Sequence, residues 1–287
     1  MTWTEPLIRR IPAAGVELAA EEYPVDAPKG TALFLHGGGQ TRHSWKGAAL
    51  TLARSGWRTF SLDTRGHGDS GWAPDGDYSM DVLVADLVAV AARVGEGDPR
   101  PPALIGASMG GLTSLLAVGE GLVDARALVL VDVAPRMARD GAERVSGFMR
   151  RHVDGFATLE DVAAAVSEYN PQRRRPRSPD GLRKNVRLAE DGRWYWHWDP
   201  ALVRRDADGP RRQPDPERLR EAARAIGVPT LLVRGAQSDV LSEEGVRGLL
   251  SLVSGSRAVD VAGTGHMVAG DDNDAFIDQV GRFLGTV

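Results

Sequence analysis

The sequence predicts an α/β protein with a mostly parallel, doubly wound sheet that carries a mainly helical insertion. Three observations predict this fold class. Short β-like runs alternate with helical stretches over both ends of the chain, which indicates a sheet covered on both faces. A serine stands between glycines where a strand passes into a helix. The middle of the chain lacks the alternation and differs in composition.

Length and composition set the limits of this prediction. A chain of 287 residues with 42% hydrophobic content can bury the core of one large domain with an insertion, or of two modest domains. The absence of cysteine excludes disulfides, thiolate catalysis and cysteine metal sites. The net charge of −4 is too small to indicate a polyanionic partner.

The apolar runs are too short to span a bilayer, and the first ten residues lack the apolar core of a secretory signal. We therefore expect a cytoplasmic protein with neither a nucleic-acid nor a membrane partner. No oligomeric state follows from the sequence.

The predicted strands are short runs rich in apolar and β-branched residues. They are residues 16–23, 31–36, 57–63, 102–107, 127–132, 229–235 and 257–263. Helices are predicted at about 44–55, at 79–94, from residue 109 and at about 274–284, with further helical sequence after residue 235. Ser79 is a candidate N-cap, and apolar residues recur at helical spacing after it.

The segment 136–225 differs from its flanks and is predicted to be an inserted lid, between core segments 1–135 and 226–287. It carries 20 Lys and Arg against 15 Asp and Glu, a balance of +5, while the remainder carries 15 against 24, a balance of −9. Its Arg-rich stretch 173–177 is most simply a solvated loop.

The strongest motif is Gly106-Ala107-Ser108-Met109-Gly110, directly after a predicted strand. This G-x-S-x-G pattern is typical of a nucleophilic serine on a strained strand-to-helix turn, where small neighbours keep the backbone clear. A serine that only caps the following helix is the simpler alternative, but a cap does not need glycines on both sides.

The chain resembles the α/β-hydrolase fold family, and in particular its lid-bearing serine esterases and lactonases. The resemblance rests on LHGGG (35–39), DTRGHGDSG (63–71), GASMGG (106–111), LVLVDVAP (128–135), RGAQSDVL (234–241) and GTGHM (263–267), which follow the family's order. It implies that 136–225 is the lid after the sixth strand and that no cofactor or metal is needed.

Ser108 requires a base, because a serine hydroxyl is a weak nucleophile at neutral pH. His266, in a glycine-flanked loop after the last strand, is the candidate and fits the family order of serine, acid, histidine. The resemblance offers two acids, Asp239 in RGAQSDVL and Asp132 at the end of ALVLVD. We favour Asp239, because its loop can reach toward His266 whereas the loop after Asp132 leads into the lid.

The glycines 37–39 after His36 raise two possibilities, a phosphate cradle or an oxyanion hole. The phosphate alternative is weaker because the stretch matches neither G-x-x-x-x-G-K-[ST] nor G-x-G-x-x-G. We therefore place the backbone N–H groups of Gly38 and Met109 at the oxyanion. Because glycines have no side chains, this loop also suggests that esters with bulky acyl or alcohol groups are accepted.

The polar residues Asp63, Arg65, His67 and Asp69 in DTRGHGDS are predicted to be structural, since such loops hold turn glycines and buried polar contacts. A second group of residues is considered for the substrate pocket. These candidates are Gly39, Trp45, Trp194, Trp196 and Trp198. The last three alternate along the chain, so they would share one face if extended, either lining a pocket or anchoring the lid.

Together these observations predict a carboxylic ester hydrolase for a small-molecule ester or lactone, acting through Ser108, His266 and Asp239. Three alternatives remain open: a ligand receptor on the same scaffold, a carbon–carbon bond hydrolase, and a cofactor-free perhydrolase with the same triad.

Overall fold

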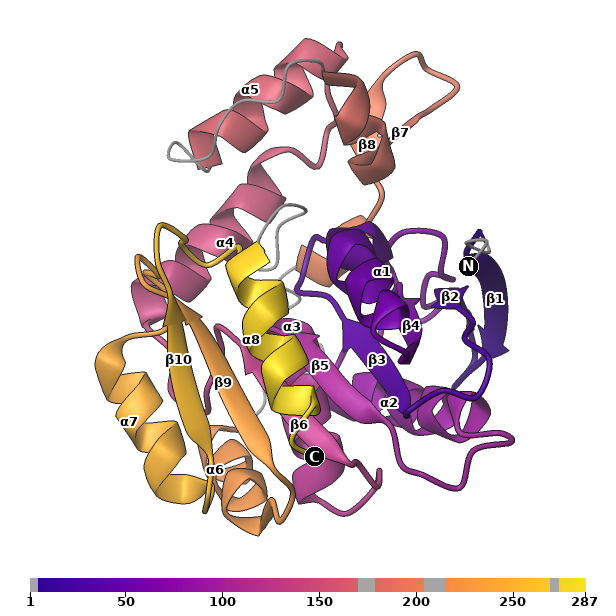
Figure 1. Cartoon of the computed structure of the whole chain (residues 1–287). Coiled ribbons are helices and arrows are strands. Elements are labelled where there is room, and N and C mark those ends of the chain that lie inside the picture. The colour runs from indigo at the N-terminus through magenta and orange to yellow at the C-terminus, as the bar shows by residue number, and fades with distance from the viewer. Residues whose placement is uncertain (1–4, 170–178, 204–214, 269–273) are drawn as a thin grey trace.

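An eight-stranded sheet forms the centre of the molecule in a computed structural model that describes residues 5–169, 179–203, 215–268 and 274–287 (Figure 1). The strand order is β1-β2-β4-β3-β5-β6-β9-β10. The strands are β1 (Leu7–Pro12), β2 (Glu17–Tyr23), β3 (Thr31–Leu35), β4 (Arg58–Leu62), β5 (Ala103–Ala107), β6 (Ala127–Val131), β9 (Thr230–Gly235) and β10 (Arg257–Val261). All seven predicted strands are confirmed, and β1 is an addition.

The sheet is parallel from β4 to β10 and antiparallel at one edge. β2 pairs antiparallel with both β1 and β4, while β3, β5, β6, β9 and β10 run parallel. The exposure of β1 explains why it escapes sequence analysis: five of its six residues are exposed, so it shows no alternation of apolar and polar positions.

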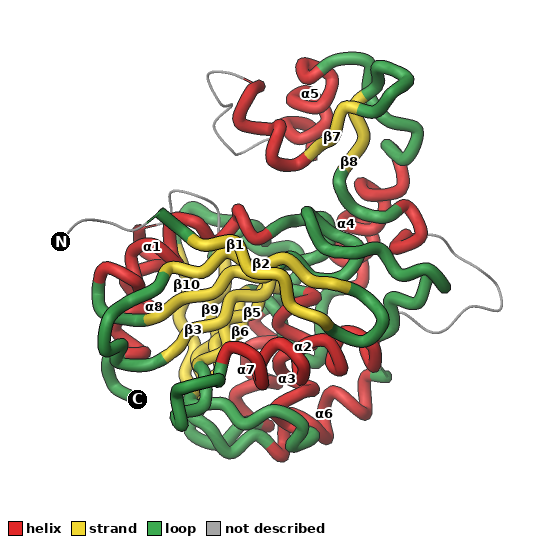
Figure 2. The backbone as a smooth tube through the Cα atoms, turned by 90° about the vertical axis from the view of Figure 1, so that its right-hand side faces the viewer, coloured by secondary structure: helices red, strands yellow, loops and turns green. Residues whose placement is uncertain are grey.

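Helices cover both faces of the sheet, as a doubly wound fold requires (Figures 1 and 2). One apolar cluster joins the sheet to α2 (Met80–Val94), α3 (Met109–Gly119), α6 (Pro216–Ala225) and α7 (Glu243–Leu252). The other joins it to α1 (Lys46–Arg54) and α8 (Asp274–Leu284). Alternate residues of β3 enter opposite clusters, Leu33 one and Phe34 the other, which is the period-two pattern of a strand buried on both faces.

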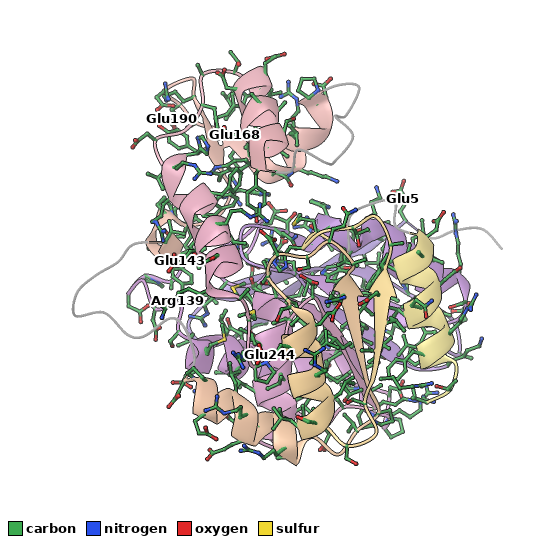
Figure 3. The ribbon with its side chains drawn as sticks, turned by 90° about the vertical axis from the view of Figure 1, so that its left-hand side faces the viewer. Glu5, Arg139, Glu143, Glu168, Glu190 and Glu244 are labelled. Atoms are coloured by element: carbon green, nitrogen blue, oxygen red, sulfur yellow. The ribbon has the colours of Figure 1, made fainter. Side chains whose placement is uncertain are left out.

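A cap stands above the core in Figure 2. It contacts the loops that follow β3, β4 and β9. It comprises α4 (Arg139–Arg151), α5 (Leu159–Tyr169), the 3₁₀ turns 179–185 and 200–203, and a hairpin of β7 (Val186–Leu188) and β8 (Trp194–Trp196). In Figure 3, α4 with Arg139 and Glu143 links the core to the upper part of the cap, where Glu168 and Glu190 lie. The Arg-rich stretch 173–177 lies outside the described residues.

The predicted end of the lid at residue 225 is wrong, because the ten residues of α6 belong to the core. Leu219, Ala222 and Ala223 are buried against the same apolar cluster as α3. α6 carries three arginines against two glutamates, so its charge resembles that of the lid segment before it, and composition alone did not separate it from the lid. The hairpin is also an addition to a lid that was predicted to be mainly helical.

Gly119 of α3 allows the close approach of α6. A Cβ at this position would lie 2.2 Å from the carbonyl oxygen of Ala222. We expect Gly119→Ala to destabilise the protein by about 1–3 kcal/mol, because two packed helices must separate. Urea unfolding measures the change.

Gly248→Ala in α7 is the matched control, since no atom lies within 4 Å of its Cβ position. It should be neutral or stabilising by about 0.5–1 kcal/mol. Equal stability of the two variants would contradict this account of the α3–α6 contact.

Candidate active site

Ser108 lies on a strained turn between β5 and α3. Its φ of 47° and ψ of −115° are rare for a residue with a side chain. The turn is tight because its glycines contact neighbouring backbone: a Cβ on Gly106 would lie 2.5 Å from the carbonyl oxygen of Gly110, and one on Gly110 would lie 2.5 Å from that of Leu35. The predicted strand, turn and helix around this serine are therefore present.

Asp132 directly follows β6, the strand that pairs with β5 beside Ser108, and its carboxylate is fully buried. Its Oδ2 lies 2.7 Å from Nδ1 of His266. The N–H of Gly235 donates to Oδ1 at 3.0 Å, and the hydroxyl of Ser238 donates to Oδ2 at 2.5 Å. Asp132 also has a positive φ of 52°, so a second non-glycine residue of the site is held in an unusual conformation.

Asp239, which we favoured as the acid, is hydrogen-bonded to the cap and, among the described residues, not to His266. Arg144 of α4 binds it with two hydrogen bonds, from Nε to Oδ2 at 2.6 Å and from Nη2 to Oδ1 at 2.8 Å. Burial raises the pKa of the Asp239 carboxyl, but the hydrogen bonds and charge of Arg144 outweigh it, so the net shift is downward. The prediction that favoured Asp239 over Asp132 is therefore wrong: Asp132 is the carboxylate that is bonded to His266.

The His266 loop folds back over the end of β9 and toward β6. The N–H of Gln237 donates to the carbonyl of Thr264 at 2.9 Å, and a Cβ on Gly235 would lie only 2.1 Å from the carbonyl oxygen of Gly265. This contact brings His266 to the buried end of β6, which a spacing argument cannot show. The chain does lead into the lid after Asp132, as expected. Asp132 itself, however, still lies at the end of the sheet, within reach of His266.

Three loops meet at this edge of the sheet. Ser108 N–H donates to the carbonyl of Val131 next to Asp132, at 3.2 Å. The amide of Gln40 donates to the sulfur of Met267 at 2.9 Å, so the glycine loop touches the residue after His266. No hydrogen bond joins Ser108 to His266 in the described ranges. Such contacts are often long before substrate binds.

The glycine loop has three backbone N–H groups, and two of them are bonded within the protein. Gly37 donates to Oε1 of Gln40 at 3.1 Å, and Gly39 donates to Nε2 of His67 at 3.0 Å. Among the residues that the structure describes, the N–H groups of Gly38 and Met109 have no acceptor. A ligand oxygen near Ser108 could therefore accept from both.

His36 and His67 support this loop from below as neutral imidazoles. Nδ1–H of His36 donates to the carbonyl of Gly37 at 2.8 Å, and its Nε2 accepts from the N–H of Thr64 at 3.1 Å. The rings of His36 and His67 meet edge to face with centroids 4.9 Å apart. Burial lowers the pKa of both, that of His67 well below its usual value.

The remaining charged residues of the DTRGHGDS loop form two groups of ion pairs, one around Arg42 and one between Arg65 and Asp86, and of these residues only Asp69 is exposed. Asp63 accepts from the guanidinium of Arg42 and from its N–H, the latter at 2.7 Å. Arg65 forms a bidentate pair with Asp86, both bonds 2.6 Å, and Arg42 binds Asp69 at 2.7 Å. Asp63 and Arg65 make the buried polar contacts that were predicted, whereas the side chain of Asp69 is half exposed.

Trp45 is not a pocket residue. It is fully buried between Phe34 and Phe276, with ring centroids 5.2 and 5.9 Å away, inside the apolar cluster under α1 and α8. Its indole supports the 3₁₀ turn η1 (Arg42–Trp45) from within the core.

Two of the three alternating tryptophans form the cap's own core. Trp196 and Trp198 are buried and stacked, with centroids 4.7 Å apart, while Trp194 carries Arg183 over its ring at 4.9 Å. Trp198 also pairs with His67 through an isolated antiparallel bridge, so it anchors the cap to the core. Of the two roles predicted for these tryptophans, Trp198 has the second, which is to anchor the lid. The prediction that they line a pocket is wrong for Trp196 and Trp198, since both are buried in the cap.

Gly39, the remaining pocket candidate, faces the cap. The thioether of Met149 in α4 lies 3.4 Å from its Cβ position and 3.9 Å from that of Gly38. Met149 is buried and belongs to the apolar cluster of the cap.

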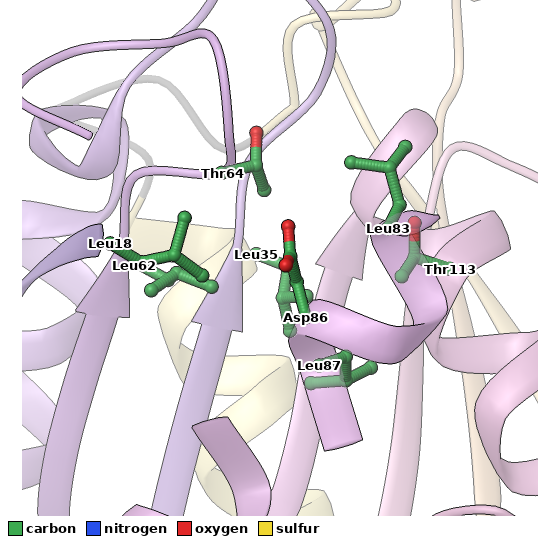
Figure 4. Close-up of a pocket in the computed structure, with 8 residues that line it drawn as sticks. All are labelled: Leu18, Leu35, Leu62, Thr64, Leu83, Asp86, Leu87 and Thr113. Carbon is green, nitrogen blue, oxygen red and sulfur yellow. The ribbon is translucent and has the colours of Figure 1, made fainter. Parts of the chain in front are cut away.

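A cavity of about 10 Å³ lies beneath the loop that carries Thr64 (Figure 4). Leucines surround it, with the Thr64 and Asp86 side chains at its polar end. Its volume is roughly that of a single water probe, so it cannot be the substrate site.

Two further residues of the site were not found from the sequence. Ser238 donates to Asp132 and accepts from the N–H groups of Val240 and Leu241, both at 3.1 Å, so it orients the buried carboxylate. Gln40 connects the glycine loop to the His266 loop. The only available signal was their position beside motifs, which did not distinguish them from ordinary loop residues.

A mostly parallel sheet with a serine on a strained strand-to-helix turn and a buried aspartate bonded to a histidine at the same edge is the arrangement of an α/β hydrolase. The model of the alpha/beta hydrolase family matches residues 32–279, and the chain belongs to this family. Among the helices described, none is both long and apolar enough to cross a membrane.

Relatives and solved structures agree with this assignment. The chain is 29% identical to the esterase Rv0045c of Mycobacterium tuberculosis, over 98% of this chain and 90% of that protein. It is 28% identical to the N-formylmaleamate deformylase of Pseudomonas putida, over 79% and 78%. An alpha/beta hydrolase from Novosphingobium aromaticivorans superimposes with a TM-score of 0.82 at 27% identity, covering 99% of both chains. These similarities support hydrolase activity.

Proposed function

We propose that the protein is a serine hydrolase of carboxylic esters, lactones included, with Ser108 as nucleophile, His266 as base and Asp132 as the acid. The 2.7 Å hydrogen bond between Asp132 and His266 carries the proposal, because it orients an imidazole at the sheet edge where Ser108 stands on its elbow. The esterase relative supports esters as the substrate class.

The buried Asp132 carboxylate accepts from Nδ1–H of His266, which leaves Nε2 free to take a proton. When an ester binds, Nε2 removes the Ser108 proton as the oxygen attacks the carbonyl carbon. Return of that proton to the leaving alcohol gives the acyl-enzyme. A water molecule, activated by the same nitrogen, then releases the acid and restores Ser108.

The tetrahedral intermediate carries a negative oxygen, for which the free N–H groups of Gly38 and Met109 are the donors. Met109 is the first residue of α3, so its N–H also lies at the positive end of the helix dipole. Each such donor typically contributes about 3–4 kcal/mol to the transition state.

A direct test combines fluorophosphonate labelling with a substrate panel. We expect the label on the peptide containing Ser108, and multiple turnovers on short-chain aryl esters and a lactone. Ser108→Ala should lose both. The panel includes an N-formyl amide because of the deformylase relative; turnover of the amide without turnover of esters would refute the proposed substrate class.

The two aspartates give a second prediction. Asp132→Asn should lower kcat for an aryl ester by about 10⁴-fold, because the amide favours the wrong imidazole tautomer. Asp239→Asn, the matched control, should keep kcat close to that of the unmodified protein, since its partner is Arg144. A collapse of kcat in Asp239→Asn alone would reverse this assignment of the acid.

Met149 gives a third prediction, because its thioether occupies the space that the glycine loop leaves open. The unmodified protein should therefore prefer primary over tertiary alcohol esters, contrary to what the glycines alone suggested. Met149→Ala should raise the ratio of kcat/KM for tertiary over primary esters by at least about tenfold, the effect of a few methylene groups in a pocket. Met137→Ala, which alters a methionine packed against the core cluster, is the control. An unchanged ratio in Met149→Ala would show that the thioether does not limit the site.

A further inference from the structure

We infer that His67 is a positioning residue for the oxyanion hole: its Nε2 holds the N–H of Gly39 so that the neighbouring N–H of Gly38 stays directed at the reacting oxygen. This inference rests on the proposed function and gives a specific task to a histidine that the sequence indicated only as structural. It depends on four properties of the glycine loop and its support.

The first property is the freedom of the loop. Three glycines in succession have more accessible backbone conformations than any other tripeptide, so the loop would not by itself hold a donor in one direction. Catalysis by an oxyanion hole requires donors fixed before the charge develops. Some other group must therefore supply the rigidity that these residues lack.

The second property is the set of bonds that the loop makes. Gly37 and Gly39, which flank Gly38, donate to Gln40 and His67 respectively. A turn bond from Gln40 N–H to the Gly37 carbonyl, at 3.1 Å, closes the loop, and Gly39 takes a positive φ of 74°. Both neighbours of Gly38 are thus fixed, while its own N–H has no acceptor within the described residues.

The third property is the protonation of His67. Its Nδ1 lies 3.0 Å from the carbonyl oxygen of Arg65, to which only Nδ1–H can donate. Nε2 is then bare and can accept from Gly39. Burial lowers the pKa of His67 well below its usual value, so the acceptor persists through the neutral range.

The fourth property is the rigidity of His67 itself. Its side chain is buried, His36 packs edge to face against it, and its backbone pairs with Trp198 at the base of the cap. The N–H of Asp199 donates to the carbonyl of Gly66 at 2.8 Å, beside this pair. His67 therefore connects the core, the cap and the glycine loop at one point.

The test compares His67→Leu, which removes the acceptor, with His67→Gln, whose side-chain carbonyl can replace it. With a short-chain aryl ester, we expect His67→Leu to lower kcat by about 10- to 100-fold with little change in KM, since the affected contact forms in the transition state. His67→Gln should recover most of the loss. His43→Leu is the control, because that half-buried imidazole lies 3.9 Å from Glu21 and makes no described contact with the glycine loop.

A trifluoromethyl ketone separates positioning from general damage, because its adduct with Ser108 places an anionic oxygen at the same donors. Its inhibition constant should rise by the factor by which kcat/KM falls. The pH profile of kcat/KM should keep its shape, since the Asp132–His266 pair is untouched. An unchanged kcat in His67→Leu, or equal losses in the Leu and Gln variants, would overturn the inference.

If His67→Leu fails to fold, nitrogen NMR of the unmodified protein decides the question. The expected spectrum has His67 as the Nδ1–H tautomer with an unprotonated Nε2, which shifts when the ketone binds. A protonated Nε2 would overturn the inference. If the unmodified protein neither turns over esters nor is labelled at Ser108, the proposed function fails, while the NMR result still reports on His67.

Discussion

The close approach of α3 to the end of β3 is the constraint on which the site depends. The Cβ position of Gly110 lies 2.5 Å from the carbonyl oxygen of Leu35, so only hydrogen fits there, and the N–H of Gly110 donates to the carbonyl of His36. This contact sets the turn at Ser108 and places the first N–H of α3 beside the glycine loop. The unfavourable backbone of Ser108 is maintained because the packed sheet and helix leave no relaxed alternative.

The division of work between two aspartates follows from burial. Asp132 is enclosed at the end of β6, where Gly235, Ser238 and His266 supply its hydrogen bonds. Asp239 is nearly half exposed and pairs with Arg144 of the cap. A carboxylate that holds an imidazole in one tautomer benefits from a dry, fully bonded environment, whereas an exposed carboxylate can pair with an arginine of the cap at low energetic cost.

Sequence alone predicted the sheet, the elbow and the histidine, because each is local: strands buried on both faces are apolar throughout, and the elbow needs glycines at fixed offsets. It failed where the outcome depends on contacts between distant segments. The choice between Asp132 and Asp239 is decided by how the His266 loop folds over β9, and Trp45 is taken into the core by Phe34 and Phe276. α6 was assigned to the lid because its composition does not differ clearly from that of the Arg- and Pro-rich segment before it.

Main-chain hydrogen bonds attach the cap to the core near the start and near the end of its described residues. On one side the N–H of Ala138 donates to the carbonyl of Val240, and on the other the N–H of Asp199 donates to the carbonyl of Gly66. Both hydrogen bonds join main-chain groups, so they do not depend on the side chains of the cap. Substitutions inside the cap therefore leave these two attachments in place, because neither depends on which side chains line its interior.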